Sequence, residues 1–123
     1  MAEIEVELED GLELEKDGPQ KRAILRELTV GDIVDANTEA ERFVQDTNGD
    51  PQLAISPTLA DVHSLRRQIK SIGSIDGPLT LGMMRKLSAT DMALLMQASE
   101  EMGEAVAMRL QARGRDEPPG GGD

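Results

Sequence analysis

The start of the chain alternates between apolar and acidic side chains. Between positions 3 and 15, glutamates occupy the odd positions apart from Gly11. Apart from Asp10, the even positions are apolar: Ile4, Val6, Leu8, Leu12 and Leu14. A period of two is typical of a strand with one buried face. The alternation keeps its phase across Asp10-Gly11, which argues against a two-residue turn there. Either a three-residue loop ending in a left-handed Gly11 or a bulge within one long strand keeps the phase, and we favour the bulge.

A second strand is predicted after the segment "KDGPQK", which combines residues that favour turns. The following run "RAILREL" carries Ala23 and Leu25 at alternate positions, with Leu28 as a further apolar candidate. These residues can pair back onto the first strand. We therefore predict an antiparallel β-hairpin over residues 1–28.

The next segment has helical spacing. Thr29 and Asp32, in "TVGD", match a capping box at a helix start. The helix is expected to end near the breaker cluster "DTNGDP" at residues 46–51. Its apolar positions recur at intervals of three, four and seven, which predicts one buried face. That face would contain Val30, Ile33, Val34, Ala40, Phe43 and Val44.

A second helix is predicted from "SPTLAD", with Thr58 as its N-cap and Asp61 three residues later. It would end around Gly73 and bury Leu59, Val62, Leu65, Ile69 and Ile72. After the turn "GSIDGP", the piece "LTLGMMRKL" predicts one or two further helical turns despite Gly82.

The last helix is predicted to open at Ser88 with Asp91 and to extend to Gly114. The ending "RGRDEPPGGGD" is rich in proline and glycine and has nothing to bury, which is typical of disorder. The expected fold class is α+β: an N-terminal antiparallel hairpin, then a small bundle of three or four helices. The boundaries are a single domain at 1–113, divided into a hairpin at 1–28 and a helical part at 29–113, and a disordered tail at 114–123.

The last helix is apolar over more of its circumference than one packed face requires. One arc about 120° wide contains Met92, Leu95, Met96, Met102, Val106 and Leu110. Further apolar positions continue beyond it: Leu94, Ala98, Ala105 and Met108. We therefore expect a second contact, with another copy or another protein, and take the six residues of the arc as the candidate partner-binding site.

Methionine dominates this part of the chain, because six of the seven methionines lie between Met83 and Met108. The unbranched thioether adapts to partners of different shape, and it also fills irregular cores. Helical methionine stripes are more often core than binding surface, so both interpretations stay open on the residues alone.

The composition of the chain narrows the range of possible partners. Acidic residues outnumber basic ones by 24 to 13, giving a net charge of −11, and Phe43 is the only aromatic residue. Such a field repels nucleic acid and anionic membranes, so we expect neither as a partner. The chain has no cysteine, its start is acidic, and its longest apolar run is five residues, Met92 to Met96. We expect no disulfide, no export signal and no membrane insertion.

Residues suited to catalysis or metal binding lack the partners that such sites need. His63 is the only histidine and is expected at the surface or the edge of the core. "DTNGDP" resembles the start of a calcium loop, but Pro57 occupies the twelfth position, where such loops carry glutamate. The basic residues are expected as counter-charge to the acidic strands: Arg66, Arg67, Lys70, Arg85 and Lys86. We predict no enzyme, no metal site and no cofactor.

The segments "LRELTVGDIVDA" and "LSATDMALLMQASEEM" carry a family resemblance. A strand pair with a glycine turn leads through "LREL" into a helix opened by "TVGD", and "GPLTLGMMRKL" precedes a last helix opened by "LSATD". Over about residues 4–105 this order resembles the tail assembly chaperones of Mu-like and related long-tailed phages. The connector "IDGPLT" departs from that family's pattern.

The resemblance implies a chaperone that binds apolar helices of the tape measure protein during tail assembly and is then released. It implies a place in the host cytoplasm and absence from the mature virion. In related phages a frameshift gives a longer product, so "GGGD" suggests an extended form of the chain as a further partner. Homo-oligomers are a further expectation.

Two alternatives remain. The glutamate-rich strand suits an acidic inhibitor or nucleic-acid mimic that occupies a basic groove. The other alternative is a structural subunit retained in the virion.

Overall fold

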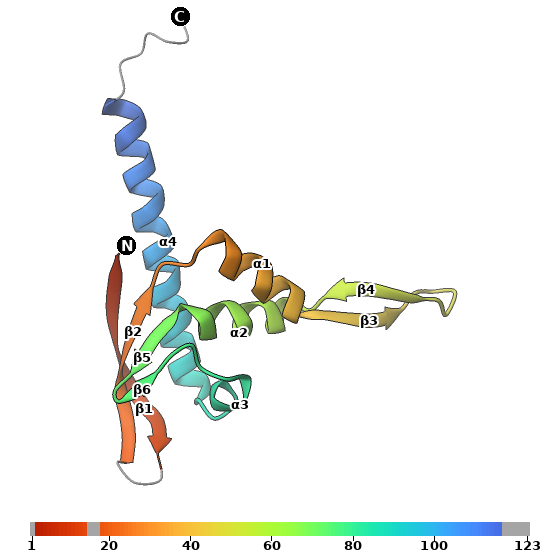
Figure 1. The fold of residues 1–123 in the computed structure, drawn as a ribbon, viewed down its shortest axis with the longest axis horizontal. Coiled ribbons are helices and arrows are strands. Elements are labelled where there is room, and N and C mark those ends of the chain that lie inside the picture. The colour runs from red at the N-terminus through yellow and green to blue at the C-terminus, as the bar shows by residue number, and fades with distance from the viewer. Residues whose placement is uncertain (1, 15–17, 117–123) are drawn as a thin grey trace, which may run out of the picture.

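The computed structural model describes residues 2–14 and 18–116 (Figure 1). Its elements, in chain order, are β1 (Glu3–Leu14), β2 (Gly18–Arg26), α1 (Val30–Glu39), β3 (Glu41–Gln45), β4 (Pro51–Ile55), α2 (Pro57–Gln68), β5 (Ile69–Ile72), β6 (Ile75–Asp76), α3 (Leu81–Met84) and α4 (Ala89–Asp116). The predicted α+β class, with an N-terminal antiparallel hairpin followed by helices, is confirmed.

A four-stranded antiparallel sheet has the strand order β1-β2-β5-β6. We call this sheet, with the helices packed against it, the body of the molecule. The β1–β2 register shifts between Glu7 and Leu12, so the predicted bulge within one long strand is confirmed. At this bulge Gly11 has a φ of +81°, and an added Cβ would lie 2.7 Å from the backbone oxygen of Gln20. Glycine is therefore required there by both conformation and space.

The bulge is held by a buried side chain from α4. The Asp91 carboxylate is 0% exposed and accepts hydrogen bonds from the backbone nitrogens of Glu9 (2.7 Å), Asp10 (3.2 Å) and Gly11 (2.8 Å). Ser88 Oγ accepts from the Asp91 backbone nitrogen at 3.1 Å, as the predicted cap requires. The carboxylate itself, however, satisfies the bulge and so fastens α4 to β1.

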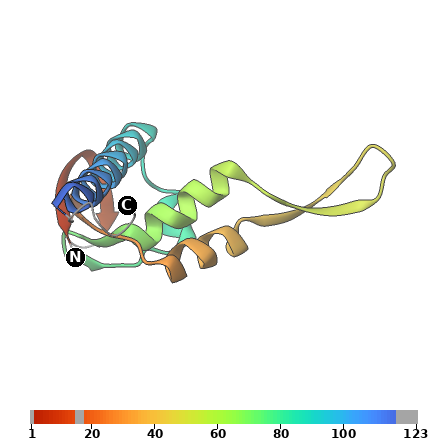
Figure 2. The same cartoon turned by 90° about the horizontal axis from the view of Figure 1, so that it is seen from above.

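The hydrophobic core is formed by residues of the sheet, α2, α3 and the first half of α4, together with Leu79. Figure 2 shows α4 running alongside β1, with α2 between α4 and the β3–β4 hairpin. Alternate residues of the first two strands supply the core, as their period of two predicts. Its buried members are Leu8, Leu12, Ala23, Leu25, Leu65, Ile69, Ile72, Ile75, Leu79, Met84, Leu95, Ala98 and Met102.

Helix α1 is shorter than predicted and does not bury the predicted face. It opens with the expected capping box of Thr29 and Asp32 but ends at Glu39, and only Ala36 within it is buried. Ala40 is also buried, whereas five members of the predicted face are exposed: Val30, Ile33, Val34, Phe43 and Val44. The prediction of one long helix was wrong because residues 41–45 pair with Pro51–Ile55 as a hairpin around Gly49, whose φ is +83°.

Helix α2 also differs from the prediction at both ends. Its N-cap is Ser56, whose side chain accepts from the Leu59 backbone nitrogen, and not Thr58. The helix ends at Gln68, and Ile69 and Ile72 belong to strand β5. A register shift in the β2–β5 pairing places both isoleucines in the core, so a spacing of three arises here without a helix.

The last part of the chain follows the prediction more closely. Residues 81–84 form the expected short helix α3, and α4 is the longest helix. Because α4 continues to Asp116, residues 114–116 are helical and the predicted tail boundary at 114 was wrong. Two segments lie outside the described residues: the remainder of that tail at 117–123 and part of the predicted turn at 15–17. No helix in the described ranges combines the length and apolar character needed to cross a membrane.

Candidate functional site

Large apolar side chains are exposed in two segments that project from the body. We call the β3–β4 hairpin, residues 41–55, the arm, and residues 103–116 of α4 the distal helix. Figure 1 shows the arm extending away from α1 and α2, and the distal helix continuing past the N-terminal end of β1. Exposed large apolar residues lie on the arm and the adjoining α1 and on the distal helix: Val30, Ile33, Val34, Phe43, Val44, Leu53, Ile55, Met108 and Leu110.

The six residues predicted as a partner-binding site are divided by the structure. Leu95 and Met102 are buried in the core, at 0% and 4% exposure. Met92 and Met96 are partly buried and pack against that core. Val106 is half-buried, and Leu110 is 61% exposed on the distal helix. Partner binding at these positions stays a prediction, and only the last two lie where the helix leaves the body.

A groove of about 400 Å³ lies beside the start of the distal helix. Its lining comes from the start of β1, the end of β2 and one face of α4: Ala2, Ile4, Glu27, Glu101, Met102, Ala105 and Arg109. Apolar side chains dominate its surface, and Arg109 pairs with Glu27 across it. A concave apolar site with a polar rim is suited to an apolar segment of a partner.

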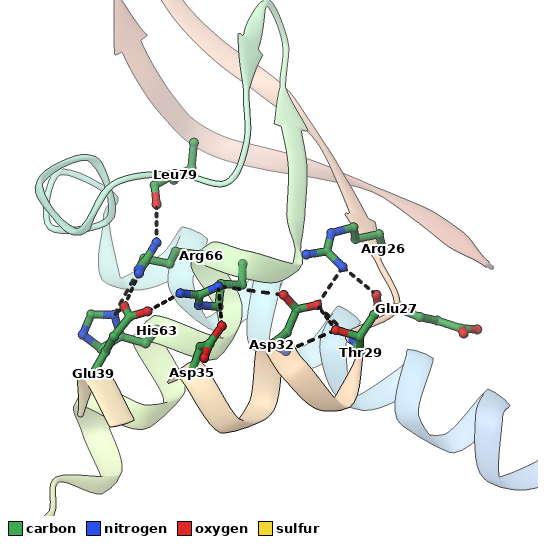
Figure 3. Close-up of polar contacts among 10 residues, drawn as sticks. Arg26, Glu27, Thr29, Asp32, Asp35, Glu39, His63, Arg66 and Leu79 are labelled. Atoms are coloured by element: carbon green, nitrogen blue, oxygen red, sulfur yellow. Dashed lines mark hydrogen bonds and ion pairs between the residues drawn. The ribbon is translucent and has the colours of Figure 1, made fainter. Parts of the chain in front are cut away.

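The base of the arm is fixed by a cluster of charges between α1 and α2 (Figure 3). The Glu39 carboxylate, in the last turn of α1, receives hydrogen bonds from Arg66 and Arg67 of α2. Arg67 also lies 3.9 Å from Asp32 Oδ1 and 3.8 Å from Asp35 Oδ2. These contacts tie α1 to α2 and so set the direction in which the arm leaves the body.

The same cluster shifts the pKa of its members. Burial alone would raise the pKa of Glu39, but hydrogen bonds from Arg67 and Arg66 outweigh burial and lower it. The hydrogen bond from Arg26 is the largest cause that lowers the pKa of Asp32. Burial lowers the pKa of His63, whose Nδ1 lies 2.9 Å from Glu39 Oε2 and 3.0 Å from Arg66 Nε. His63, at 6% exposure, is thus a residue of the core edge.

The five basic residues of the predicted cluster do not all form ion pairs with the acidic strands. Arg66 and Arg67 neutralise acids of α1, whereas Lys70 alone of the predicted cluster reaches a strand, through Glu3 at 2.6 Å. Within residues 2–14 and 18–116, Arg85 and Lys86 form no ion pair. The prediction of counter-charge for the strands was therefore wrong for most of the cluster.

The calcium-like segment closes the tip of the arm. Asp46 Oδ1 accepts from the backbone nitrogens of Asn48 (2.8 Å) and Asp50 (3.0 Å), and Asp46 Oδ2 accepts from Gln52 Nε2 (3.1 Å). Across the part of the chain that the structure describes, no group of three His, Cys, Asp or Glu side chains is arranged to hold a metal ion. The segment therefore acts as a turn in the structure.

Comparison with known proteins identifies the family. The family model described as tail assembly protein gp41 matches residues 8–115. The chain is 43% identical over 122 residues to the probable tail assembly protein gp41 of Escherichia phage Mu, covering 94% of this chain and 84% of the relative. The chain belongs to the gp41 tail assembly protein family.

Two further gp41 relatives match. The chain is 38% identical over 108 residues to the Mu-like prophage FluMu protein gp41 of Haemophilus influenzae, covering 88% of this chain and 84% of the relative. It is 42% identical over 121 residues to the probable tail assembly protein FS-gp41 of phage Mu, covering 93% of this chain but 64% of that longer relative. No solved structure matches the chain.

Membership in the gp41 family confirms the resemblance to Mu-like phage proteins and gives the chain a role in phage tail assembly. The family description names tail assembly and no reaction. The functional question is therefore which surfaces of a gp41 protein contact the components that it helps to assemble.

Proposed function

We propose that the chain is a tail assembly chaperone that binds apolar helical segments of the tape measure protein and is released as the tail forms. Binding would cover client surface that otherwise aggregates, while the net charge of −11 would keep the complex soluble. This proposal adds a client and a release step to the assembly role of the family.

The observation that carries the proposal is the bare distal helix beside an apolar groove. Apart from half-buried Val106, residues 103–114 are exposed, although Met108 and Leu110 are large and apolar. An amphipathic client helix could lie along this helix and insert side chains between Ile4 and Ala105. Exposed apolar surface of this kind supports an interaction site on the distal helix.

Release requires modest affinity, and the site's composition is suited to it. The apolar lining consists of Ala2, Ile4, Met102 and Ala105, no aromatic residue is among the lining residues, and the one arginine, Arg109, is already paired with Glu27. Interfaces gain most of their affinity from aromatic and arginine hot spots. A client bound mainly by small and flexible side chains would dissociate when the tail tube offers a better-packed surface.

The test is co-expression with the tape measure protein of the same phage. We expect the native chain to raise the soluble fraction of the tape measure protein. The double variant Val106→Ser/Leu110→Ser should lose this effect, whereas Gln97→Ser/Gln111→Ser, which changes exposed polar positions of the same helix, should keep it. An unchanged soluble fraction with the native chain would overturn the proposal.

We further propose that the chaperone acts in the host cytoplasm and is absent from the mature virion. Mass spectrometry of purified particles should then detect tail tube protein without this chain. Its retention in stoichiometric amount would instead support the structural-subunit alternative.

An extended form made by frameshifting is a separate part of the proposal. Support comes from FS-gp41 of phage Mu, a longer relative that matches nearly the same length of this chain as gp41 does. A slippery run in the glycine codons of "GGGD" and a longer product in infected cells are expected. Absence of the longer product by mass spectrometry would contradict it.

The acidic-mimic alternative receives less support from the contacts of β1. Glu3 pairs with Lys70 and Glu5 pairs with Arg22, so part of the glutamate row is neutralised within the chain. A mimic of nucleic acid needs its charges free for a basic groove. High salt should therefore leave client binding largely intact under the chaperone proposal.

A further inference from the structure

A second pocket, of about 330 Å³, lies where the base of the arm meets α2 and α3, and it shares no lining residue with the groove beside the distal helix. Its lining residues are Arg42, Leu59, Val62, Leu81, Met84 and Arg85. Met84 is buried, and Leu59 and Leu81 are half-buried. Within the described residues, neither leucine belongs to the core or to the side chains that pack against it. Their apolar surface is therefore left for a ligand.

Arg42 is held in place through only one of its three side-chain nitrogens. Its Nη1 donates to the backbone oxygens of Glu39 and Glu41 at 3.0 and 2.6 Å. Across residues 2–14 and 18–116, Nε and Nη2 of Arg42 donate to no other group. A guanidinium fixed in this way keeps its Nε and Nη2 hydrogens as a fork, which binds a carboxylate through two parallel hydrogen bonds.

The positive charge at this pocket is not neutralised by the described part of the chain. Neither Arg42 nor Arg85 forms an ion pair there. The Glu39 carboxylate, one turn before Arg42, is already bound by two arginines of α2. In a chain with 24 acidic and 13 basic residues, two unpaired arginines at one pocket reverse the local charge. Such a patch attracts a carboxylate from another molecule.

We propose that this pocket binds an acidic peptide segment of another protein, in which an apolar side chain stands next to a glutamate or aspartate. The apolar side chain enters the pocket against Leu59 and Leu81. The neighbouring carboxylate accepts two hydrogen bonds from Arg42, and Arg85 adds a second positive charge. Because the pocket lies apart from the distal helix, this binding does not depend on the chaperone role.

A peptide fits the pocket better than a nucleic acid or a membrane does. Either of those would bring many negative charges against a chain whose net charge is −11. The pocket instead combines four apolar residues with a fork for one carboxylate. That combination matches a short stretch of apolar and acidic residues, since pockets fix a peptide through a buried apolar side chain and a few polar contacts.

NMR of the full chain, labelled with ¹³C at the methionine methyl groups, tests the site. Met84 lines the pocket, whereas Met108 lies on the distal helix. The probe is a hexapeptide with blocked ends, in which two leucines are flanked on each side by two glutamates. We expect the Met84 signal to shift with a Kd of about 0.1 to 1 mM, and the Met108 signal to stay unchanged. Glutamines in place of the glutamates, or serines in place of the leucines, should each weaken binding about tenfold.

Two substitutions of Arg42 test the fork. Arg42→Gln should weaken peptide binding about tenfold, because both the charge and the fork are lost. Arg42→Lys keeps the charge but cannot form the two parallel hydrogen bonds, so it should recover only part of the affinity. Arg113→Gln, the same change at an exposed arginine of the distal helix, should leave the affinity unchanged. The methyl signal of Met102, in the core, reports whether each variant is folded.

Four results would overturn the proposal. The first is a Met84 signal that the glutamate peptide leaves unshifted up to about 10 mM. The second is equal binding of the glutamate and glutamine peptides, which would leave the arginines without a role. The third is a Met84 signal that shifts with octanoate but not with the peptide, which would make the ligand a small molecule.

The fourth is a Met84 signal that shifts as the chain alone is concentrated, which would mean that a second copy fills the pocket. All four results leave the soluble fraction of the tape measure protein unaffected. Failure here is therefore distinguishable from failure of the chaperone role.

Discussion

The body and its two projecting segments use the same apolar residue types in opposite surroundings. In the body, Leu95 and Met102 of α4 are enclosed by the sheet and α2. In the distal part of the same helix, Met108 and Leu110 are 69% and 61% exposed, and on the arm Phe43 is 79% exposed. Apolar burial in the body therefore stabilises the fold, whereas the apolar side chains of the projecting segments contribute little to it.

The largest contrast is expected between two leucines of α4. Leu95→Ala should lower the free energy of unfolding by about 3 kcal/mol, because it leaves a cavity in the core. Leu110→Ala, on the exposed distal helix, should change it by less than about 0.5 kcal/mol. Urea denaturation followed by circular dichroism measures both. Equal losses would mean that the distal helix is also part of the core.

The next effect concerns the contact that fastens α4 to the bulge. Asp91→Asn keeps the side-chain volume but replaces one acceptor oxygen with a donor, facing the backbone nitrogens of residues 9–11. We expect a loss of about 2 kcal/mol in unfolding free energy. Glu100→Gln, the same change of chemistry on an exposed position of α4, should cost almost nothing. A neutral Asp91→Asn would show that the bulge does not need this carboxylate.

A smaller, pH-dependent effect is expected at the base of the arm. The folded state lowers the pKa of Glu39 from its ordinary value of 4.5, so its stabilisation is present above that value and lost as the pH falls through the lowered pKa. The pKa of His63 is lowered from 6.5, so its contribution also falls on acidification, beginning near pH 6.5.

Glu39→Gln should therefore cost about 1 kcal/mol at pH 7 and reduce the loss of stability below pH 4.5. His63→Gln should flatten the dependence that begins near pH 6.5. Thermal melts from pH 3 to pH 8 measure both. An unchanged acid slope in Glu39→Gln would exclude the ion cluster as its cause.

The smallest effect on stability is expected from the arm. Phe43→Ser and Val30→Ser should each change the unfolding free energy of the monomer by less than about 0.5 kcal/mol, because both side chains are largely exposed. Urea denaturation measures both changes. A loss comparable to that of Leu95→Ala would place Phe43 in a core and remove the contrast between the regions.

The sequence correctly predicted the elements whose residue spacing fits only one kind of secondary structure. Contacts between residues close in sequence determine three of them: the β1 alternation with its bulge, the capping box at Thr29 and the start of α4 at Ser88. The role of Asp91 in binding the bulge could not be predicted, because it joins residues about 80 positions apart.

The wrong predictions arose where apolar residues in strands have spacings that also fit a helix. Ala40, Phe43 and Val44 have helical intervals, yet the last two lie on the arm. The Asn48-Gly49 pair between "ERFVQ" and "PQLAI" was the available signal, since that dipeptide between short apolar runs favours a hairpin. The predicted binding arc on α4 could not distinguish enclosed from bare positions, because a helix does not encode which neighbours cover it.

Client binding is proposed at the distal helix and the groove beside it, and not at residues 92–99 of α4. Amide hydrogen exchange of the chain, alone and with an apolar helical fragment of the tape measure protein, tests it directly. Addition of the fragment is expected to slow exchange in residues 103–114 and to leave exchange in residues 92–99 unchanged. Binding without any slowing in residues 103–114 would contradict it.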